Sequence, residues 1–445
     1  MTKLLLILVS VFVWWNQVFA DTHACNGTAS SCQSAINAAS DGDIVSIPAG
    51  NFTWTSGVTI NNKNITLQGE GIGVTNITAG TTGCLISVVP STKPFRITGF
   101  TISTTVDSDG FIRIRNGCNQ STACEPPDIV GTWRIDHIRF NINSGGRMYP
   151  CIQVTQDDPG LVDNCYFYNA GTYLIGLRHL AANGSYDVTH LTQQWGEKAR
   201  TRATGMGTAD AVFMEDNTVE RGSNGGYTTI CDAEGSSRLV IRYNTFIGKS
   251  PWGTPVGFQS HSTGNLGRGQ VFMEVYNNNW TTENSGYNIG IIRSGTGVIY
   301  NNTVVGTPNV LVDDERSCSS PPAGANNIPG PRCYGSGTWD GNLTGEQGWP
   351  CLDQIGMGSS TSPGRYGNYN IHEPMYIWNN GGLIFENNSE CALSDTHVRS
   401  TAHSNGQVDY VVGSAKPGYA PYIYPHPSRT GNDSPATPQN LRVVQ

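Results

Sequence analysis

The sequence IRYNTF at residues 241–246 belongs to a pattern that recurs along the chain. In the clear copies an apolar residue is followed by a variable residue, a polar residue, an Asn and a small residue, and in the weaker copies an apolar residue or Cys takes the place of the Asn. Clear copies begin at Met214, Ile241, Val275 and Ile299, a later copy begins at Phe385, and weaker copies begin at Ile97, Ile135 and Val162. Such internal self-similarity indicates a repeat architecture.

The spacing of the fourth position of the pattern predicts the fold. This position falls at Phe100, Ile138, Cys165, Asn217, Asn244, Asn278, Asn302 and Asn388. The shortest steps are 24 residues (278 to 302) and 27 residues (217 to 244). A repeat this short holds two or three strands and no helix, as in a β-solenoid whose stacked coils are about 4.8 Å apart. We therefore predict an all-β fold, a right-handed parallel β-helix with long loop insertions.

The recurring Asn also predicts a specific interaction. Stacked Asn side chains can bond amide to amide along the axis of a solenoid and cap the backbone of the turn. Alternatively, Asn occurs here only because it favours turns. The recurrence within matched flanking residues favours an Asn ladder over the alternative.

The chain is predicted to have four parts. They are a signal peptide at residues 1–20, an N-terminal cap with the first strands at 21–60, a β-helix at 61–404 with insertions near 180–209 and 314–373, and a Pro- and Tyr-rich tail with a linker-like end at 405–445. The leader has a positive Lys3, an apolar stretch and an Ala-type cleavage site at Ala20. A short amphipathic helix over Ser31–Ala39 is predicted to cover the open end of the solenoid, where apolar core and strand edges would otherwise be exposed.

Composition and cysteine usage indicate an exported protein. Charged residues make up 13% of the chain and the formal net charge is −8, which argues against binding to nucleic acid. The apolar leader is too short to span a bilayer, so no membrane span is predicted. The 12 Cys residues include three close pairs, predicted to be disulfides in an oxidising compartment: Cys25/Cys32, Cys118/Cys124 and Cys318/Cys333. Cys165 and Cys231 are interpreted as buried thiols within strands.

Several motifs resemble those of a known superfamily. The segment DGDIVSIPAG at residues 41–50, the segment NITLQGEG at 64–71 and the Asn-rich coils resemble the pectate-lyase-like parallel β-helix superfamily, over most of residues 30–400. The resemblance implies a right-handed parallel β-helix and favours a polysaccharide lyase. The Arg-centred motif and calcium-binding aspartates of pectate lyases have no match here, so the resemblance assigns no catalytic residue.

Candidate site residues come from the strand that precedes each Asn segment. These strands are predicted at residues 173–179, 228–233, 256–261, 288–293 and 309–314. When these strands are aligned by their ends, the polar residues at their C-terminal ends are His179, Asp232, His261, Arg293 and Asp313. The last four of these residues would be neighbours on one outward face. Arg268, Asp314 and Glu315 would flank them. A mixed row of acid, imidazole and guanidinium can bind a charged sugar chain and move a proton. The alternative is an ordinary solvated face, and a one-residue slip would turn a side chain to the other face.

The first functional hypothesis is cleavage of an acidic polysaccharide by β-elimination in a secreted enzyme. Arg293 or Arg268 would neutralise the sugar carboxylate, His261 would be the base, and Asp232 would orient it. Further contacts to the polysaccharide are predicted from His179, Glu315 and Trp339. Asp313 and Asp314 could hold Ca²⁺ through carboxylate oxygens, or could simply be solvated acids.

Two other classes remain open. A glycoside hydrolase would need two carboxylates across the sugar bond, which Asp232 with Asp313 or Asp314 could supply. Alternatively, the protein is a non-catalytic extracellular adhesin, fibre or scaffold that associates with itself or attaches to a cell surface. The fold by itself does not distinguish these functions.

Overall fold

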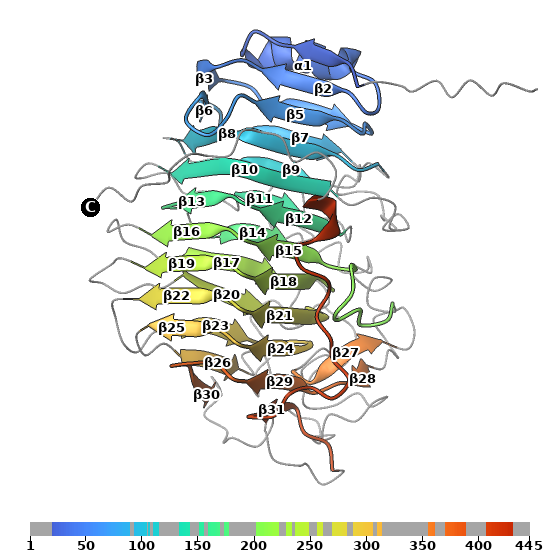
Figure 1. The fold of residues 1–445 in the computed structure, drawn as a ribbon, viewed down its shortest axis with the longest axis vertical. Helices are drawn as coiled ribbons and strands as arrows, with labels where there is room; N and C mark the ends of the chain where they lie inside the picture. Colours follow the sequence, from blue (N-terminus) through green and yellow to red (C-terminus); the bar gives the residue numbers. More distant parts are fainter. Residues whose placement is uncertain are drawn as a thin grey trace, which may run out of the picture.

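The computed structural model describes most of the repeating part of the chain. The described residues are 20–89, 93–104, 106, 110–114, 133–142, 151–154, 159–169, 173–177, 202–221, 228–233, 236–248, 256–260, 269–282, 288–305, 309–313, 355–360, 370–388 and 406–429. They form a nearly all-β structure of stacked parallel strands with one α-helix, α1 (Ala29–Ala38), at one end (Figure 1). The predicted leader, residues 1–20, lies outside the described residues except for Ala20.

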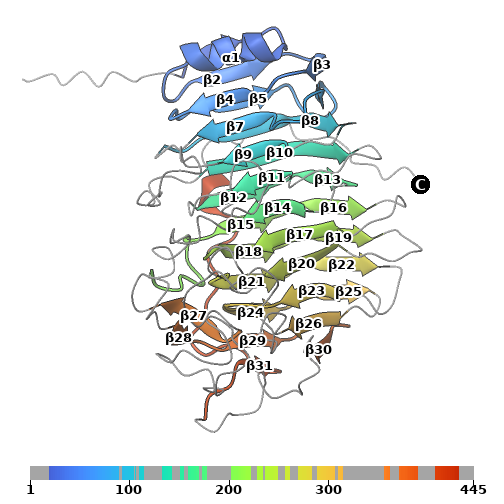
Figure 2. The ribbon, with the colours of Figure 1, turned by 180° about the vertical axis from the view of Figure 1, so that it is seen from behind.

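The described strands fall into three parallel columns, which Figures 1 and 2 show from opposite sides. Column 1 contains β1 (Thr22–Ala24), β2 (Ile44–Ile47), β5 (Thr66–Gly69), β12 (Gly160–Asp163), β15 (Val212–Glu215), β18 (Arg238–Arg242), β21 (Phe272–Tyr276), β24 (Thr296–Tyr300), β29 (Met375–Trp378) and β31 (Tyr410–Val412). Column 2 contains β3 (Gly50–Trp54), β6 (Thr75–Ala79), β13 (Tyr166–Tyr168), β16 (Thr218–Arg221), β19 (Thr245–Gly248), β22 (Asn279–Thr282) and β25 (Thr303–Val305). The long strands β8 (Arg96–Thr104) and β10 (Trp133–Ile142) pass through both columns.

Column 3 is a separate parallel sheet. It contains β4 (Val58–Asn61), β7 (Ile86–Val89), β9 (Ile112–Ile114), β11 (Ile152–Val154), β14 (Tyr173–Leu177), β17 (Thr228–Ala233), β20 (Val256–Ser260), β23 (Asn288–Ile292), β26 (Asn309–Asp313) and β30 (Ile384–Asn388). Each coil of chain adds one strand to each column in turn, as in β15, β16 and β17. Two further strands, β27 (Met357–Ser360) and β28 (Asn370–His372), form an antiparallel pair beside the stack.

The core lies between the columns and consists of residues stacked from coil to coil. In column 1 the register brings one aliphatic side chain from each coil into a continuous stack: Ile97, Ile135, Val162, Met214, Ile241, Val275, Ile299 and Ile377. Aromatic residues do the same in column 2, where the rings of Phe140 and Phe167 stack with centroids 4.7 Å apart. Because strand residues alternate between two faces, the residues between these positions point away from the core.

The predicted Asn ladder is present at the turn between columns 1 and 2. The side-chain amide of Asn217 donates to Asn244 Oδ1 at 3.0 Å, Asn244 donates to Asn278 at 3.0 Å, and Asn278 donates to Asn302 at 3.0 Å. All four side chains are buried. In the earlier coils the equivalent positions are the buried apolar residues predicted from the pattern.

The last predicted member of the ladder was wrong. Asn302 donates to Asn380 at 2.8 Å, so Asn380 is the next rung. Asn388 instead ends β30 in column 3, where it pairs with Asp313. The physical reason is that column 3 strands and the ladder turns both carry Asn beside apolar residues, and the spacing across the 314–373 insertion does not separate the two.

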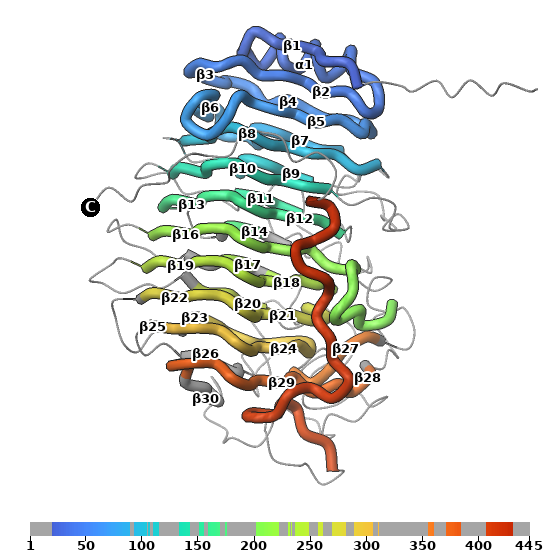
Figure 3. Tube along the Cα trace, viewed as in Figure 1, coloured from blue at the N-terminus to red at the C-terminus, as the bar shows by residue number. Residues whose placement is uncertain are grey.

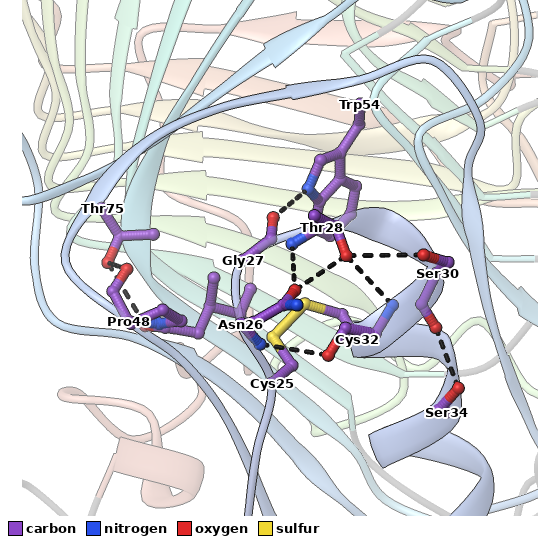
Figure 4. Close-up of a disulfide and its surroundings, with 12 residues drawn as sticks. Cys25, Asn26, Gly27, Thr28, Ser30, Cys32, Ser34, Pro48, Trp54 and Thr75 are labelled. Atoms are coloured by element: carbon purple, nitrogen blue, oxygen red, sulfur yellow. Dashed lines mark hydrogen bonds between the residues drawn. A yellow bond between two sulfur atoms is a disulfide. The ribbon is translucent and has the colours of Figure 1, made fainter.

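Helix α1 contacts the first strands of the stack. It begins at the N-cap Thr28, whose hydroxyl accepts a hydrogen bond from the Ser31 amide at 3.3 Å. The Cys25–Cys32 disulfide closes the loop before the helix, as predicted (Figure 4). The indole of Trp54, which ends β3, donates to Gly27 O at 2.9 Å beside this disulfide.

The other end of α1 is also tied to the strands. The ammonium of Lys63 donates to three carbonyls at the helix C-terminus, of Ile36, Asn37 and Ala39, at 2.6–2.8 Å. This satisfies acceptors that have no partner within the helix. Gln33 exchanges two hydrogen bonds with the backbone of Thr59 in β4. The helix is therefore fixed over the first coil.

Of the remaining cysteine predictions, one can be compared with the structure and the other cannot. Cys165 and Cys231 are buried thiols, as interpreted from the sequence, and burial raises the pKa of Cys231 to about 12. The pairs Cys118/Cys124 and Cys318/Cys333 lie outside the described residues. Among the residues that the structure describes, no helix is long and apolar enough to cross a membrane.

Candidate functional site

A row of polar residues follows the outward face of column 3. The strand register places Arg113 of β9 beside Gln153 of β11, and Gln153 beside Gly176 of β14. The row continues through Asp232 of β17 to Gln259 of β20. We call Arg113, Gln153, Asp232 and Gln259 the polar row.

Strand alternation explains why these positions line up. Arg113 lies between Ile112 and Ile114, which are both buried in the core, and Gln153 lies between the buried residues Ile152 and Val154. Inward apolar residues on both sides force the middle residue outward, because successive side chains of a strand alternate between its faces. One polar side chain per coil is therefore presented at the same register position.

Guanidinium and amide groups meet at two places on this face. The Nε of Arg113 donates to Gln153 Oε1 at 2.5 Å. Further along the stack, Arg293 Nη1 reaches Gln259 Oε1 at 3.5 Å. Arg293 directly follows β23, and its backbone amide donates to Ser260 Oγ at 3.0 Å, which fixes the chain beside β20. Gln153, Gln259 and Arg293 are each less than a tenth exposed.

Gly176 interrupts the polar row at its middle. It lies in register between Gln153 and Asp232, so the strand carries no side chain at this position. A glycine inside a strand commonly allows another backbone or a ligand to approach closely. The polar row thus has Arg113 and Gln153 on one side of Gly176, and positions 232 and 259 on the other. Arg293 is not a member, because Gln259 is in register with Ile291, but its guanidinium reaches Gln259 from two residues further along the chain.

The register places some of the predicted site residues and shifts one of them. Because Ile292 pairs with Val312, Arg293 and Asp313 are the next residues of neighbouring strands. Asp232 pairs with Gln259, two residues before His261, so alignment by strand ends was displaced here. Asp232 precedes the last residue of β17, whereas His261 follows the last residue of β20, so the two do not align. An irregularity between Thr229 and Asp232, which the sequence pattern does not reveal, shifts the register by one residue.

The other predicted site residues are not placed. His179, His261, Arg268, Asp314, Glu315 and Trp339 lie outside the described residues. For Asp232 and Asp313 the strand position is described, and the side chain is not. Their roles as catalytic, substrate-binding or metal-binding residues therefore stay predictions.

Sequence reasoning missed three members of this face: Arg113, Gln153 and Gln259. The signal was available, since each is a single polar residue inside a short apolar strand, as in Ile112-Arg113-Ile114. The candidate residues were taken from the C-terminal ends of the strands, and polar residues inside the strands were not considered. The outward position of a buried strand is the more reliable place to look, because the core residues on both sides fix its direction.

Metal binding at Asp313 and Asp314 also stays a prediction. Within the described part of the chain, no three His, Cys, Asp or Glu side chains gather in a group that could hold a metal ion. Carboxylates and carbonyl oxygens are the ligands that Ca²⁺ prefers. By register, the backbone of Asp313 lies beside that of Asn388 in β30 and next to the position of Arg293, which follows β23.

A second row of charged residues lies on the outward face of column 1, where the side chains are buried and paired within the protein. Here Glu215 forms an ion pair with Arg242 at 2.6 Å, and both side chains are fully buried. Glu274 accepts hydrogen bonds from the Tyr419 hydroxyl at 2.5 Å and from the Gly207 amide at 2.7 Å. Burial raises the pKa of Glu274, against the effect of these hydrogen bonds.

The N-terminal part of the same row is held by arginines. Asp136 accepts from Arg96 at 2.6 Å and is 2.6 Å from the imidazole of His137. Burial raises the pKa of this carboxyl, but the hydrogen bonds from Arg96 and His137 outweigh it and hold the pKa below its usual range. Every carboxylate named on column 1 already has a hydrogen-bond or ion-pair partner within the protein. This row is therefore less suited to an external ligand than the polar row of column 3.

Comparison with known proteins gives structural neighbours and no sequence family. No family model and no curated protein matches the chain. An alginate lyase from Paenibacillus sp. str. FPU-7 is similar at 15% identity and a TM-score of 0.40, with 64% of this chain and 95% of that chain covered. A polysaccharide lyase of the PL6 family from Pseudopedobacter saltans is similar at 16% identity and a TM-score of 0.37, with 89% and 94% covered.

Proposed function

We propose that this protein is secreted, binds an acidic polysaccharide along the outward face of column 3, and cleaves it by β-elimination. The observation that carries the proposal is the polar row, in which guanidinium, amide and carboxylate groups share one register position on successive strands. A stacked row with a repeat of about 4.8 Å suits an extended polymer better than a compact ligand.

The proposed chemistry needs three groups. A cation neutralises the uronic acid carboxylate, a base removes the ring proton beside it, and an acid protonates the departing glycosidic oxygen as the carbon–carbon double bond forms. We assign the cation to Arg293, with Arg268 as a second candidate. His261 is the proposed base, because the pKa of imidazole lies near neutral pH.

The supporting roles are proposed for neighbouring residues. Asp232 would bind and orient the reacting groups from β17. His179, Glu315 and Trp339 would contact the polysaccharide on either side of the reacting sugar. Asp313 and Asp314 would hold Ca²⁺, which would supply a further positive charge for the substrate carboxylate.

The proposal extends to the architecture that presents this face. We propose that the coils close into a right-handed parallel β-helix with α1 as its N-terminal cap, from residue 21 to about 404, followed by the tail at 405–445. The Cys25–Cys32 disulfide supports an oxidising, extracellular environment. The segments 180–209 and 314–373 would be insertions that line the binding face.

A glycoside hydrolase built on Asp232 and Asp313 is less well supported. The register separates these residues by three strand steps and two residues along the strand. At about 4.8 Å per step and 3.3 Å per residue, their backbones are roughly 16 Å apart. The two carboxyl groups of glycosidases are about 5–9.5 Å apart, which short aspartate side chains do not reach from there.

The test is a product assay on a panel of acidic polysaccharides, with and without Ca²⁺. The expected result is ultraviolet absorbance from an unsaturated sugar end, lost in Arg293→Ala and His261→Ala while the far-ultraviolet circular dichroism spectrum is unchanged. Arg139→Ala is the matched control, because Arg139 lies on column 2 over the ring of Tyr166. Reducing ends without the absorbance would indicate a hydrolase. No product from any substrate would favour an adhesin or scaffold.

A further inference from the structure

The C-terminal residues 416–429, which we call the strap, cross the outward face of column 1. Figures 1 and 3 show this segment running from β31 back along the stack to β12, where it ends in a short 3₁₀ helix (Pro427–Arg429). From β29 to β10 the strap passes six strand steps, or about 29 Å. Fourteen residues can span at most about 50 Å when extended, so the strap is long enough to cover this distance without being fully extended.

At its start the strap contacts the last coils of the stack. Lys416 is 3.1 Å from Glu373, and its ammonium lies over the ring of Tyr376 in β29. The ring of Tyr419 packs edge-on against Tyr300 of β24. The same Tyr419 hydroxyl binds Glu274 of β21, so one side chain touches two successive strands.

In its middle the strap is held through its backbone. The buried guanidinium of Arg242, in β18, donates to Tyr422 O at 2.7 Å and to Ile423 O at 2.9 Å. The ring of Tyr424 stacks on Tyr243 with centroids 3.7 Å apart. Arg242 also pairs with Glu215 of β15, so its charge joins the strap to two coils at once.

The end of the strap contacts the middle of the stack. Arg429 lies 3.2 Å from Glu215 and 3.5 Å from Asp163 of β12, and it also pairs with Asp216. The amide of His426 donates to Glu215 Oε1 at 3.0 Å. Ser428 O accepts from Arg134 of β10 at 3.4 Å. Contacts therefore follow one another from β29 to β10.

This arrangement changes how the stack can open. In a solenoid each coil contacts only its neighbours, so coils at an end can separate without disturbing the rest. The strap adds contacts between residues more than 200 positions apart in sequence. Opening a gap between any two coils from β10 to β29 must also break the strap away from at least one side.

We propose that the strap is a lock that makes the coils from β10 to β29 open as one cooperative unit. Its release is then the event that frees the C-terminal coils. The lock has a specific fit, because Gly207 with φ +73° lies against the strap, where a Cβ would come within 2.1 Å of Ala420 O. The proposal is independent of the proposed activity.

The test is hydrogen exchange measured by mass spectrometry on three chains. One ends after Gly413 and lacks the strap, one ends after Arg429 and keeps it, and one is the full chain. We expect exchange in β24 and β29 to be at least tenfold faster without the strap, with β2 and β5 unchanged and the Arg429-terminated chain like the full chain. Adding a synthetic peptide of residues 414–429 should restore protection.

A second variant tests the lock in the full chain. Gly207→Ala should displace the strap and accelerate exchange in β24 and β29, while Gly406→Ala, at an exposed glycine of similar φ with open space around it, should not. This variant decides the matter if the shortened chain does not fold. The proposal is overturned if β24 and β29 stay protected without the strap, or if β2 and β5 lose protection to the same degree.

Discussion

Replacing Asn244 by Ala removes the central rung of the Asn ladder. The Asn244 side chain is fully buried and accepts hydrogen bonds from both the backbone amide and the side chain of Asn217. It donates to Met214 O and Arg242 O, each at 2.9 Å. The substitution therefore takes a partner from three buried backbone groups, the amide of Asn217 and the carbonyls of Met214 and Arg242, at the junction of three coils. The side-chain amide of Asn217 also loses Asn244 but keeps its bond to Val162 O.

The magnitude follows from these groups. A buried polar group that loses its partner costs about 1–3 kcal/mol, so three such groups give a loss of about 3–9 kcal/mol in opening free energy. Since about 1.4 kcal/mol corresponds to a factor of ten, exchange should accelerate on the order of 100-fold or more. The effect should be largest in the peptides that cover β15, β18 and β21.

The assay is hydrogen exchange of these peptides compared with a matched control. Asn301→Gly changes an exposed Asn at φ +53° directly before the ladder residue Asn302, and Gly accepts this backbone conformation without strain. The control should stay within about 0.5 kcal/mol of the wild type. If Asn244→Ala and Asn301→Gly accelerate exchange equally, the ladder contributes no more than an exposed turn residue, and the reasoning is refuted.

Two further predictions concern pH and the disulfide. Burial lowers the pKa of His426 to about 4, opposed by Glu215 and assisted by Arg242, Arg134 and Arg429. A lowered histidine pKa disfavours the protonated form, so strap docking should be complete above about pH 6.5 and weaken by up to about 3 kcal/mol as the pH falls to 4. His426→Gln should remove this part of the pH dependence of exchange in β24; an unchanged profile would contradict it. Replacing Cys25 and Cys32 by Ala should destabilise α1 by about 2 kcal/mol, measured by exchange in residues 29–38, with β24 unaffected.

Much of the fold was predictable because stacking repeats the same local chemistry. The six-residue pattern around Asn244 indicated the coil length and predicted the ladder. The ladder rung at Asn380 also had a signal, since Ile377-Trp378-Asn379-Asn380 fits the pattern. It was missed because Asn388 lies in a similar sequence, and only strand pairing assigns one to the turn and the other to column 3.

The site was less predictable because its geometry depends on register between coils. A single irregularity in β17 shifts Asp232 by one position relative to β20, and no local signal in the sequence marks it. The contacts of Arg429 with Glu215 are a second example. These contacts join residues 214 positions apart in the sequence. The sequence around Arg429 does not indicate that it contacts Glu215, and the sequence around Glu215 does not indicate it either.

The three outward faces of the stack differ in chemistry, and this difference directs the functional assignment to column 3. On column 1, charged side chains such as Arg242 and Glu215 already have partners within the protein, and the strap lies over them. On column 2, the register lines up Arg139 with neutral side chains such as Asn279 and Thr303, and the Arg139 guanidinium lies over the ring of Tyr166. On column 3, Arg113 and Arg293 each hydrogen-bond the amide of a glutamine of the polar row. An acidic polymer is attracted by positive charge on an extended face, and column 3 carries a guanidinium near each end of the polar row.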